Sequence, residues 1–356
     1  MINSVKKRNP KNRFYAQSRL GIFFLFFLLV GCARKPAEIV LAGKTMGTTY
    51  TVKIVPGDQQ VNPESLQSGI DSVLVEINRQ MSTYLEQSEI SQFNRSQELT
   101  PFPVSPEFAA VVQRALEISA LTKGAFDITV MPLVDLWGFG PRHSQDDQIW
   151  SPPKAAEIEI MLRQIGYDKL SVSNGTIRKA IPGLKLDVNA IAKGYGVDAL
   201  ANYLTRRGFN RYLIEIGGEV RCRGENPKGE PWLIGIDQPR LGSMPGADIR
   251  TTIPLENNAL ATSGDYRNYF EYQGEYYSHA IDPRTGYPTQ SEVASATVMA
   301  PTCMDADALA TALMILGEKE GLNLIESLEE VEALIVLRNR DGQFRQRISS
   351  GMKLSK

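Results

Sequence analysis

The segment Leu186–Asp198 constrains this chain more tightly than any other. Short apolar residues lead to the carboxylate of Asp187, and a run rich in small residues follows, with Lys193 near its start. We expect a strand that ends at Asp187 and a helix over residues 190–207. Free N–H groups at a helix start favour phosphate, glycines let a ligand approach the backbone, and the lysine adds positive charge. The pattern therefore predicts a site for a polyanionic ligand.

Part of the same segment fits a different fingerprint. Gly194–Ala199 matches the G-x-G-x-x-A pattern of dinucleotide-binding folds. That pattern needs its first glycine in the tight turn directly after a strand. Here the glycines fall inside the predicted helix, so the sequence argues against a Rossmann site.

The N-terminus has the organisation of a secretory signal. The apolar run Leu20–Val30 follows six basic residues and is too short to span a bilayer. It ends at Gly31-Cys32, which resembles a bacterial lipobox, in which the cysteine is lipidated; the alternative is an ordinary cleaved signal with an incidental cysteine. We predict a signal peptide over 1–31, a lipidated Cys32 with a tether to residue 42, and one folded domain over 43–350. The protein would then lie lipid-anchored on the periplasmic face of a membrane, and Ala33 favours the outer one.

Charge and cysteine content narrow the classes of partner. The whole chain has 39 basic and 40 acidic residues, and loss of the six basic residues of the signal leaves 33 against 40. A net negative domain is a poor candidate for nucleic-acid binding. Cys222 and Cys303 remain; they could pair in an oxidising compartment or stay as buried thiols.

Helices and strands are expected to mix without strict alternation. Asn62-Pro63-Glu64 and Ser105-Pro106-Glu107 are helix starts, each with a capping side chain followed by proline. The second half is richer in alternating, strand-like segments. The mixture predicts an α+β fold with largely antiparallel sheets.

A carboxylate and a hydroxyl share one face of a predicted helix over 305–316. Asp307 and Thr311 are four residues apart, so their oxygens lie on the same side. Hard oxygen ligands suit Mg²⁺, which takes its other ligands from phosphate and water. Acids in a first helical turn also stabilise any helix, and a threonine can bond within one, so the pair alone leaves both interpretations open.

His279 and His143 are the two histidines of the chain. His143 falls in a polar loop. His279 ends a strand-like segment and precedes the turn Asp282–Gly286, where an imidazole could act as a general base near neutral pH. A plain strand-end histidine is the alternative.

Weaker signals lie elsewhere. Thr262–Arg267 suits phosphate contact or an ordinary turn. Asp127 follows a helix and could hold a ribose or adenine edge, or cap the turn. Met46 opens the first predicted strand and could touch a ring or simply pack, and Tyr84 could stack on an aromatic ligand.

Taken together and in order, these motifs resemble the FAD:protein FMN transferase (ApbE) family over nearly all of the mature chain. The matching pieces are Met46–Thr48, Met81–Tyr84, Ser88–Ser91, Gly124–Asp127, Pro132–Pro141, Asp187–Asp198, Ile216–Glu219, Thr262–Asp265, His279–Gly286 and Asp305–Leu313. The resemblance implies a T-fold-like α+β architecture with a flavin nucleotide in a cleft, and makes 43–350 the catalytic domain.

The resemblance also implies a reaction and its residues. FAD would be split at its pyrophosphate in a Mg²⁺-dependent step, FMN transferred to a threonine hydroxyl of a target protein, and AMP released. The implied target is a subunit of a membrane redox complex such as the sodium-translocating NADH:quinone reductase. His279 and Asp307 are implied as catalytic. Contacts to FAD are implied for Met46, Tyr84, Ala125, Phe126, Asp127, Asp187, Lys193, Ala280 and Ile281, where Ala280 replaces an isoleucine common in the family. The implied Mg²⁺ ligands are Asp307, Thr311 and the backbone carbonyl of Ala190.

Two other functions use the same site. In a Mg²⁺-dependent FAD pyrophosphatase, water replaces the threonine. In a non-enzymatic flavin-binding lipoprotein, nothing is cleaved; an Asp307–Thr311 pair beside His279 favours an enzyme over such a store.

Overall fold

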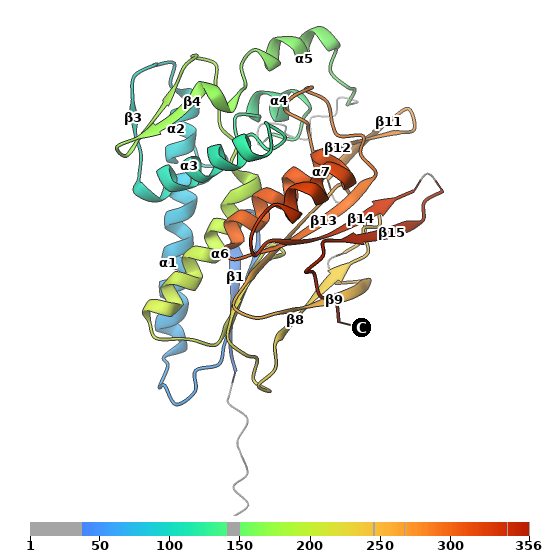
Figure 1. Ribbon diagram of the computed structural model, residues 1–356. Helices are drawn as coiled ribbons and strands as arrows, with labels where there is room; N and C mark the ends of the chain where they lie inside the picture. Colours follow the sequence, from blue (N-terminus) through green and yellow to red (C-terminus); the bar gives the residue numbers. More distant parts are fainter. Residues whose placement is uncertain (1–37, 141–149, 245, 267, 340, 356) are drawn as a thin grey trace, which may run out of the picture. The chain divides into compact units, whose positions relative to one another are not determined.

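An antiparallel sheet organises the chain (Figure 1). The computed structural model describes residues 38–140, 150–244, 246–266, 268–339 and 341–355. These residues belong to one folded unit. Its main sheet has eight strands among the described residues, in the order β1 (Ile39–Thr45), β2 (Thr48–Ile54), β6 (Tyr212–Ile216), β7 (Glu219–Arg223), β10 (Ala259–Gly264), β13 (Val293–Ala300), β14 (Glu332–Arg338) and β15 (Phe344–Ile348).

Helices cover one face of this sheet. The long helices α1, α6 and α7 pack on it, with α7 against β10 and β13 and α6 against β6 and β7 (Figure 1). The described helices are α1 (Pro63–Met81), α2 (Glu89–Arg95), α3 (Pro106–Leu121), α4 (Met131–Leu136), α5 (Ala155–Leu162), α6 (Asn189–Arg206) and α7 (Cys303–Glu326), with a 3₁₀ turn at Tyr167–Lys169.

Three smaller antiparallel sheets complete the unit. They are β3 (Phe102–Pro103) with β5 (Thr176–Lys179) and β4 (Leu170–Ser173), β8 (Trp232–Asp237) with β9 (Ile249–Leu255), and β11 (Tyr269–Tyr272) with β12 (Glu275–Ser278). The predicted α+β fold with largely antiparallel sheets is confirmed.

The period-2 pattern of the strands separates two cores. On β6, Ile214 packs with the α1 and α6 side chains, whereas its neighbour Leu213 packs with Trp232 and Leu255 of the β8–β9 sheet. Successive side chains of a strand point to opposite faces. The β8–β9 sheet therefore covers part of the face opposite the helices.

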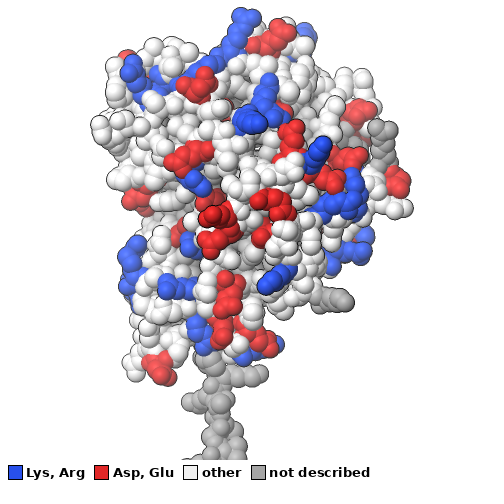
Figure 2. Space-filling model, viewed as in Figure 1, with Lys and Arg blue, Asp and Glu red and all other residues white. Residues whose placement is uncertain are grey.

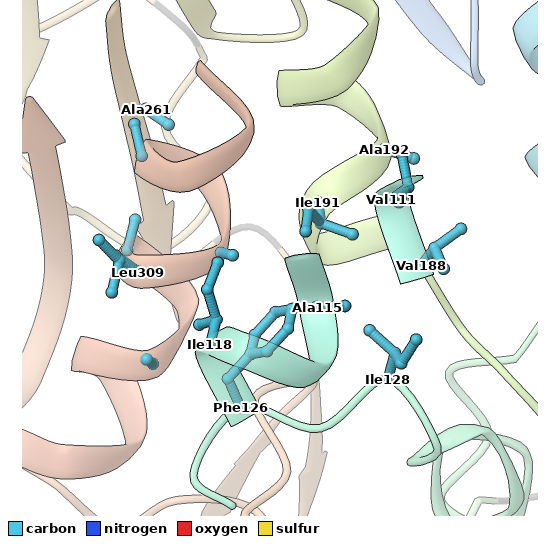
Figure 3. Close-up of a cluster of buried hydrophobic side chains, with 14 of the residues drawn as sticks. Val111, Ala115, Ile118, Phe126, Ile128, Val188, Ile191, Ala192, Ala261 and Leu309 are labelled. Carbon is cyan, nitrogen blue, oxygen red and sulfur yellow. The ribbon is translucent and has the colours of Figure 1, made fainter. Parts of the chain in front are cut away.

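Both helix starts that were predicted from capping residues are present. Asn62 Oδ1 accepts a hydrogen bond from Ser65 N at 3.0 Å, and Ser105 Oγ accepts one from Phe108 N at 3.3 Å. Behind α3, the largest buried cluster joins it to α6 and α7 through side chains such as Ile118, Ile191 and Leu309 (Figure 3). This cluster fixes α6 and α7 side by side.

Several sequence-based boundaries were wrong. Strand β1 begins at Ile39, inside the predicted tether 32–42, because Leu41 is buried against the core. The domain extends past residue 350, since Met352 is buried and Ser355 bridges to Thr252. Thr262–Gly264 lies in strand β10 rather than a turn.

No strand ends at Asp187 in the described residues. The segment before α6 makes only a single parallel bridge, from Lys185 to Val130. Leu184, Leu186 and Val188 are buried in the main core instead. The apolar alternation that suggested a strand thus reflects side chains anchored in the core.

Some predictions concern residues outside the described part. The signal 1–31, Cys32, Ala33 and His143 all lie there. Among the described residues, no helix has the length and hydropathy needed to cross a membrane. Cys222 and Cys303 are both buried free thiols.

Helices α6 and α7 approach each other unusually closely at Gly194. A Cβ placed there would lie 2.3 Å from Cys303 O and 2.8 Å from Met304 Cα, both backbone atoms of α7. The carboxylate of Asp198, one helical turn further on, accepts hydrogen bonds from Cys303 N at 3.0 Å and Met304 N at 2.9 Å. Glycine and aspartate together hold the start of α7 against α6.

Replacement of Gly194 by alanine should lower the free energy of unfolding by about 1–3 kcal/mol, the usual cost of overpacking a tight contact. Urea denaturation followed by circular dichroism measures it. Asn202→Ala, at an exposed position of the same helix, is the matched control and should change stability little. Equal stability of both variants would show that the helices are not in contact there.

Candidate functional site

A single cavity of about 800 Å³ gathers nearly all predicted site residues. Its size is in the usual range for a small-molecule site. The predicted residues that line it are Tyr84, Ala125, Phe126, Asp127, Asp187, Ala190, Lys193, His279, Ala280, Ile281, Asp307 and Thr311. Segments far apart in the sequence thus share one cavity.

Met46 is the described site residue that does not line the cavity. It packs instead beside α6, where a Cβ on Gly196 would lie 3.1 Å from Met46 Cε. Its neighbours Thr48 and Thr49 do line the cavity. Contact between Met46 and a flavin stays a prediction.

Asp307 links α7 to the first turns of α6. Its carboxylate is almost fully buried, and Oδ2 accepts a hydrogen bond from Gly194 N at 3.0 Å. In a regular helix, that N–H would donate to the carbonyl of Ala190. Asp307 shares or takes over this donor, and a carbonyl oxygen has two lone pairs, so the Ala190 carbonyl keeps capacity to accept a cation.

Thr311 lies one turn after Asp307 and also lines the cavity. Its hydroxyl is 3.0 Å from Ser263 Oγ on β10. A hydroxyl has one proton to donate and two acceptor lone pairs. If Thr311 donates to Ser263, its lone pairs remain for a ligand.

Lys193 lies between two buried carboxylates. Its Nζ is 2.7 Å from Glu219 Oε1 and 3.7 Å from Asp307 Oδ1. Burial raises the pKa of Glu219 to about 7, although Lys193 opposes the shift. Burial likewise raises the pKa of Asp307, again opposed by Lys193.

The charge of the cavity suits a divalent cation. Its described lining has one ammonium, Lys193, against six carboxylates, namely Asp127, Asp187, Glu215, Glu219, Asp237 and Asp307. An anionic ligand would be repelled unless further positive charge were bound. Among the described residues, no three His, Cys, Asp or Glu side chains converge on one metal position. A single carboxylate with hydroxyl and carbonyl oxygens fits Mg²⁺, which keeps several ligands from water or phosphate.

The two other predicted aspartates differ in how much bonding capacity they retain. Asp127 accepts hydrogen bonds from Thr129 N, Thr129 Oγ1 and Tyr167 N at 2.7–2.8 Å, so both its oxygens are engaged. Asp187 accepts one, from Asn189 N at 2.8 Å, and burial raises its pKa to about 6. Asp187 therefore keeps an oxygen for a ligand, while Asp127 mainly shapes its turn.

His279 follows the β11–β12 hairpin and faces the cavity. Its Nδ1 is 3.0 Å from the carbonyl oxygen of Asn268. A carbonyl only accepts, so the proton of the neutral ring is on Nδ1, and Nε2 is an acceptor with no hydrogen bond to another described residue. Desolvation lowers the pKa of His279, partly offset by the Asn268 carbonyl and by Asp265.

Aromatic packing anchors this hairpin. Trp150 stacks on Phe270 with ring centres 4.5 Å apart, and Phe139 contacts the same ring at 4.9 Å. Phe139 also meets the His279 ring edge-on at 6.2 Å. The imidazole is thereby held at the cavity by neighbours that bear no charge.

Sequence reasoning missed part of this site. In the sequence, Glu219 stands out only as the last residue of the motif Ile216–Glu219. The cavity wall that β8 and β9 form around Ile234 and Ile249 was not predicted. Glu219 follows Gly217 and Gly218, both with positive φ, which form the tight turn between β6 and β7. A carboxylate directly after a two-glycine turn is the signal that could have drawn attention to it.

Comparison with known proteins agrees with this geometry. The model of the ApbE family matches residues 46–335. The chain belongs to the ApbE family. A curated relative from Vibrio cholerae, named FAD:protein FMN transferase, is 42% identical over 326 residues, or 92% of this chain and 95% of that protein. A relative of the same name from Haemophilus influenzae is 39% identical, with 92% and 94% covered.

Solved structures of the ApbE family share the fold. The flavin transferase ApbE from Vibrio cholerae superposes with a TM-score of 0.79 at 40% identity, covering 88% of this chain and 97% of that one. The apo form of the Pseudomonas stutzeri flavinyl transferase ApbE gives 0.78 at 35% identity, with 88% and 95% covered. The sequence-based assignment to this family is confirmed.

The His279 imidazole should titrate below its ordinary value of 6.5, because the cavity disfavours the charged ring. The ring is then neutral at pH 7. Because the side chain is solvent-exposed, the shift adds little stability, which is present above pH 6.5 and is lost as pH falls through the lowered pKa. NMR titration measures it, with His143→Gln to assign the two rings. A pKa above 6.5 would contradict this environment.

Proposed function

We propose that this chain is a FAD:protein FMN transferase, which moves FMN from FAD to a threonine hydroxyl of a target protein and releases AMP. The observation that carries the proposal is one cavity that joins Asp307 and Thr311 of α7, Lys193 of α6 and His279. Relatives that bear this enzyme's name over 92% of the chain support it.

Each residue has a chemical task in the transfer. The Lys193 ammonium attracts the diphosphate of FAD, and the start of α6 offers N–H groups to it. Asp307, Thr311 and the Ala190 carbonyl would hold Mg²⁺. When bound, Mg²⁺ supplies charge neutralisation for the diphosphate and for the departing phosphate. Transfer at phosphorus depends mainly on such positioning and neutralisation.

His279 serves as the general base. The threonine oxygen forms a bond to the FMN phosphorus, the bond from that phosphorus to the bridging oxygen breaks, and AMP leaves with that oxygen. The hydroxyl proton passes to Nε2, which carries no proton of its own because Nδ1 holds it and donates it to the Asn268 carbonyl. Such a base typically contributes about 10²–10⁴-fold to the rate.

The cellular setting is part of the same proposal. Lipidation at Cys32 would anchor the protein on the periplasmic face of a membrane, with Ala33 favouring the outer one. The acceptor would be a membrane redox subunit, such as one of the sodium-translocating NADH:quinone reductase. The face in Figure 2 carries basic and acidic side chains interspersed. Because the mature chain has 33 basic against 40 acidic residues, we propose no nucleic-acid partner.

Replacing Asp307 with alanine should abolish transfer and leave the fold intact, because the carboxylate is the one charged group among the proposed metal ligands. Asp305→Asn is the matched control: it lies on the same helix but pairs with Arg114 outside the cavity, and should retain activity. The assay incubates the protein from residue 33 onward with FAD, Mg²⁺ and an acceptor peptide, and follows peptide mass and AMP.

The products separate the candidate functions. A mass gain on the peptide's threonine with AMP release supports transfer. AMP and free FMN without labelling would indicate the pyrophosphatase, and unchanged FAD the flavin-binding module. Full activity of Asp307→Ala, or full activity without metal, would contradict the proposed site.

A further inference from the structure

The Lys193 ammonium lies near the Asp307 oxygen that the proposed function assigns to a divalent cation. Lys193 Nζ is 3.7 Å from Asp307 Oδ1, too far for an ordinary hydrogen bond. The flexible lysine stem could close this gap and form a direct pair of about 2.8 Å. Asp307 would then be occupied by an ammonium in place of a metal.

Glu219 holds the lysine at its observed position. Its Oε1 is 2.7 Å from Lys193 Nζ, so the ammonium lies closer to Glu219 than to Asp307. Glu219 is 3% exposed, and its Oε2 has no hydrogen-bond partner among the described residues. A carboxylate so desolvated, with an oxygen left unbonded, attracts the only ammonium in the described lining strongly.

The backbone of Glu219 is fixed in the main sheet by strand pairing. It is the first residue of β7 and pairs with Ile216 across the tight turn. Lys193, by contrast, reaches from α6 on a long side chain. In this pair the carboxylate is therefore the fixed member and the ammonium the adjustable one.

We propose that Glu219 is a positioning residue that draws Lys193 away from Asp307 and so keeps the carboxylate open to a divalent cation. The inference rests on the proposed function, because that function makes Asp307 a metal ligand. It assigns Lys193 two partners in turn: Glu219 in the resting protein and the ligand's diphosphate when FAD binds.

The alternative is that Glu219 acts only through its negative charge. A buried carboxylate near the site would attract any cation, with or without Lys193. The two explanations differ in the lysine-free protein. A positioning role vanishes when Lys193 is removed, whereas a through-space charge effect persists.

The test measures Mn²⁺ binding to the soluble protein without FAD, by electron paramagnetic resonance. Glu219→Gln should weaken binding about tenfold, because closing the gap from 3.7 Å to a direct pair strengthens the competing attraction by about that factor at an effective dielectric constant of about 20. Lys193→Met should bind Mn²⁺ at least as well as the parent. In the double variant the loss caused by Glu219→Gln should disappear.

Glu215→Gln is the matched control. It removes a carboxylate from the same cavity, but one that accepts from Gly218 N and makes no ion pair with a described residue. It should change Mn²⁺ binding far less than Glu219→Gln. A crystal structure of Glu219→Gln should also show Lys193 in direct contact with Asp307.

The outcomes separate this inference from the proposed function. The positioning role is overturned if Glu219→Gln binds Mn²⁺ as tightly as the parent, or if its tenfold loss persists in the Lys193→Met background. FMN transfer by the parent stands in both cases. Absence of Mn²⁺ binding by the parent overturns the metal site and, with it, this inference. Loss in the single variant with recovery in the double variant supports it.

Discussion

The contact between Asp307 and the backbone of Gly194 is the interaction on which the rest of the site depends. It joins α7 to the start of α6 through a 3.0 Å hydrogen bond. It requires a residue without a Cβ at position 194, because the α7 backbone occupies that space. It also brings the Asp307 carboxylate to the first turns of α6, where Ala190 lies. One contact thus sets the helix spacing and arranges oxygen ligands.

Electrostatics then decide what such a cavity can hold. A ligand with a diphosphate is anionic, yet the described lining has a large excess of carboxylates. Desolvation raises the pKa of Asp187, Glu219 and Asp307, because burial disfavours their charged forms, and Lys193 only partly offsets this at Glu219 and Asp307. Bound positive charge would stabilise both the charged carboxylates and the anionic ligand. The acidic cavity is therefore consistent with a metal-assisted reaction of a diphosphate.

Local signals in the sequence predicted local structure well. Asn62 and Ser105 cap helices as expected, and the second half is rich in strands as predicted. The helix expected from residue 190 is present, but the strand expected to end at Asp187 is not, because buried alternation arises wherever a segment crosses a core. Thr262–Gly264 forms a strand because it pairs with Ser295–Thr297 of β13, and this partner is too distant in sequence for a local signal to predict it.

The site shows the same division. The sequence could predict that one site gathers Asp307, Thr311 and Lys193, because helix periodicity and charge are local properties and the order of the motifs resembles that of the family. The role of Glu219 could not be read from the sequence, since it depends on which ammonium lies 2.7 Å away in the folded chain. The engagement of both Asp127 oxygens by the backbone likewise appears only in three dimensions.

Anomalous X-ray diffraction from crystals soaked in Mn²⁺ tests the central claim most directly. If the proposed site binds the metal, one peak should lie at about 2.0–2.3 Å from an Asp307 carboxylate oxygen, the Thr311 hydroxyl and the Ala190 carbonyl. A peak elsewhere in the cavity, or none beside Asp307 at saturating Mn²⁺, would contradict it.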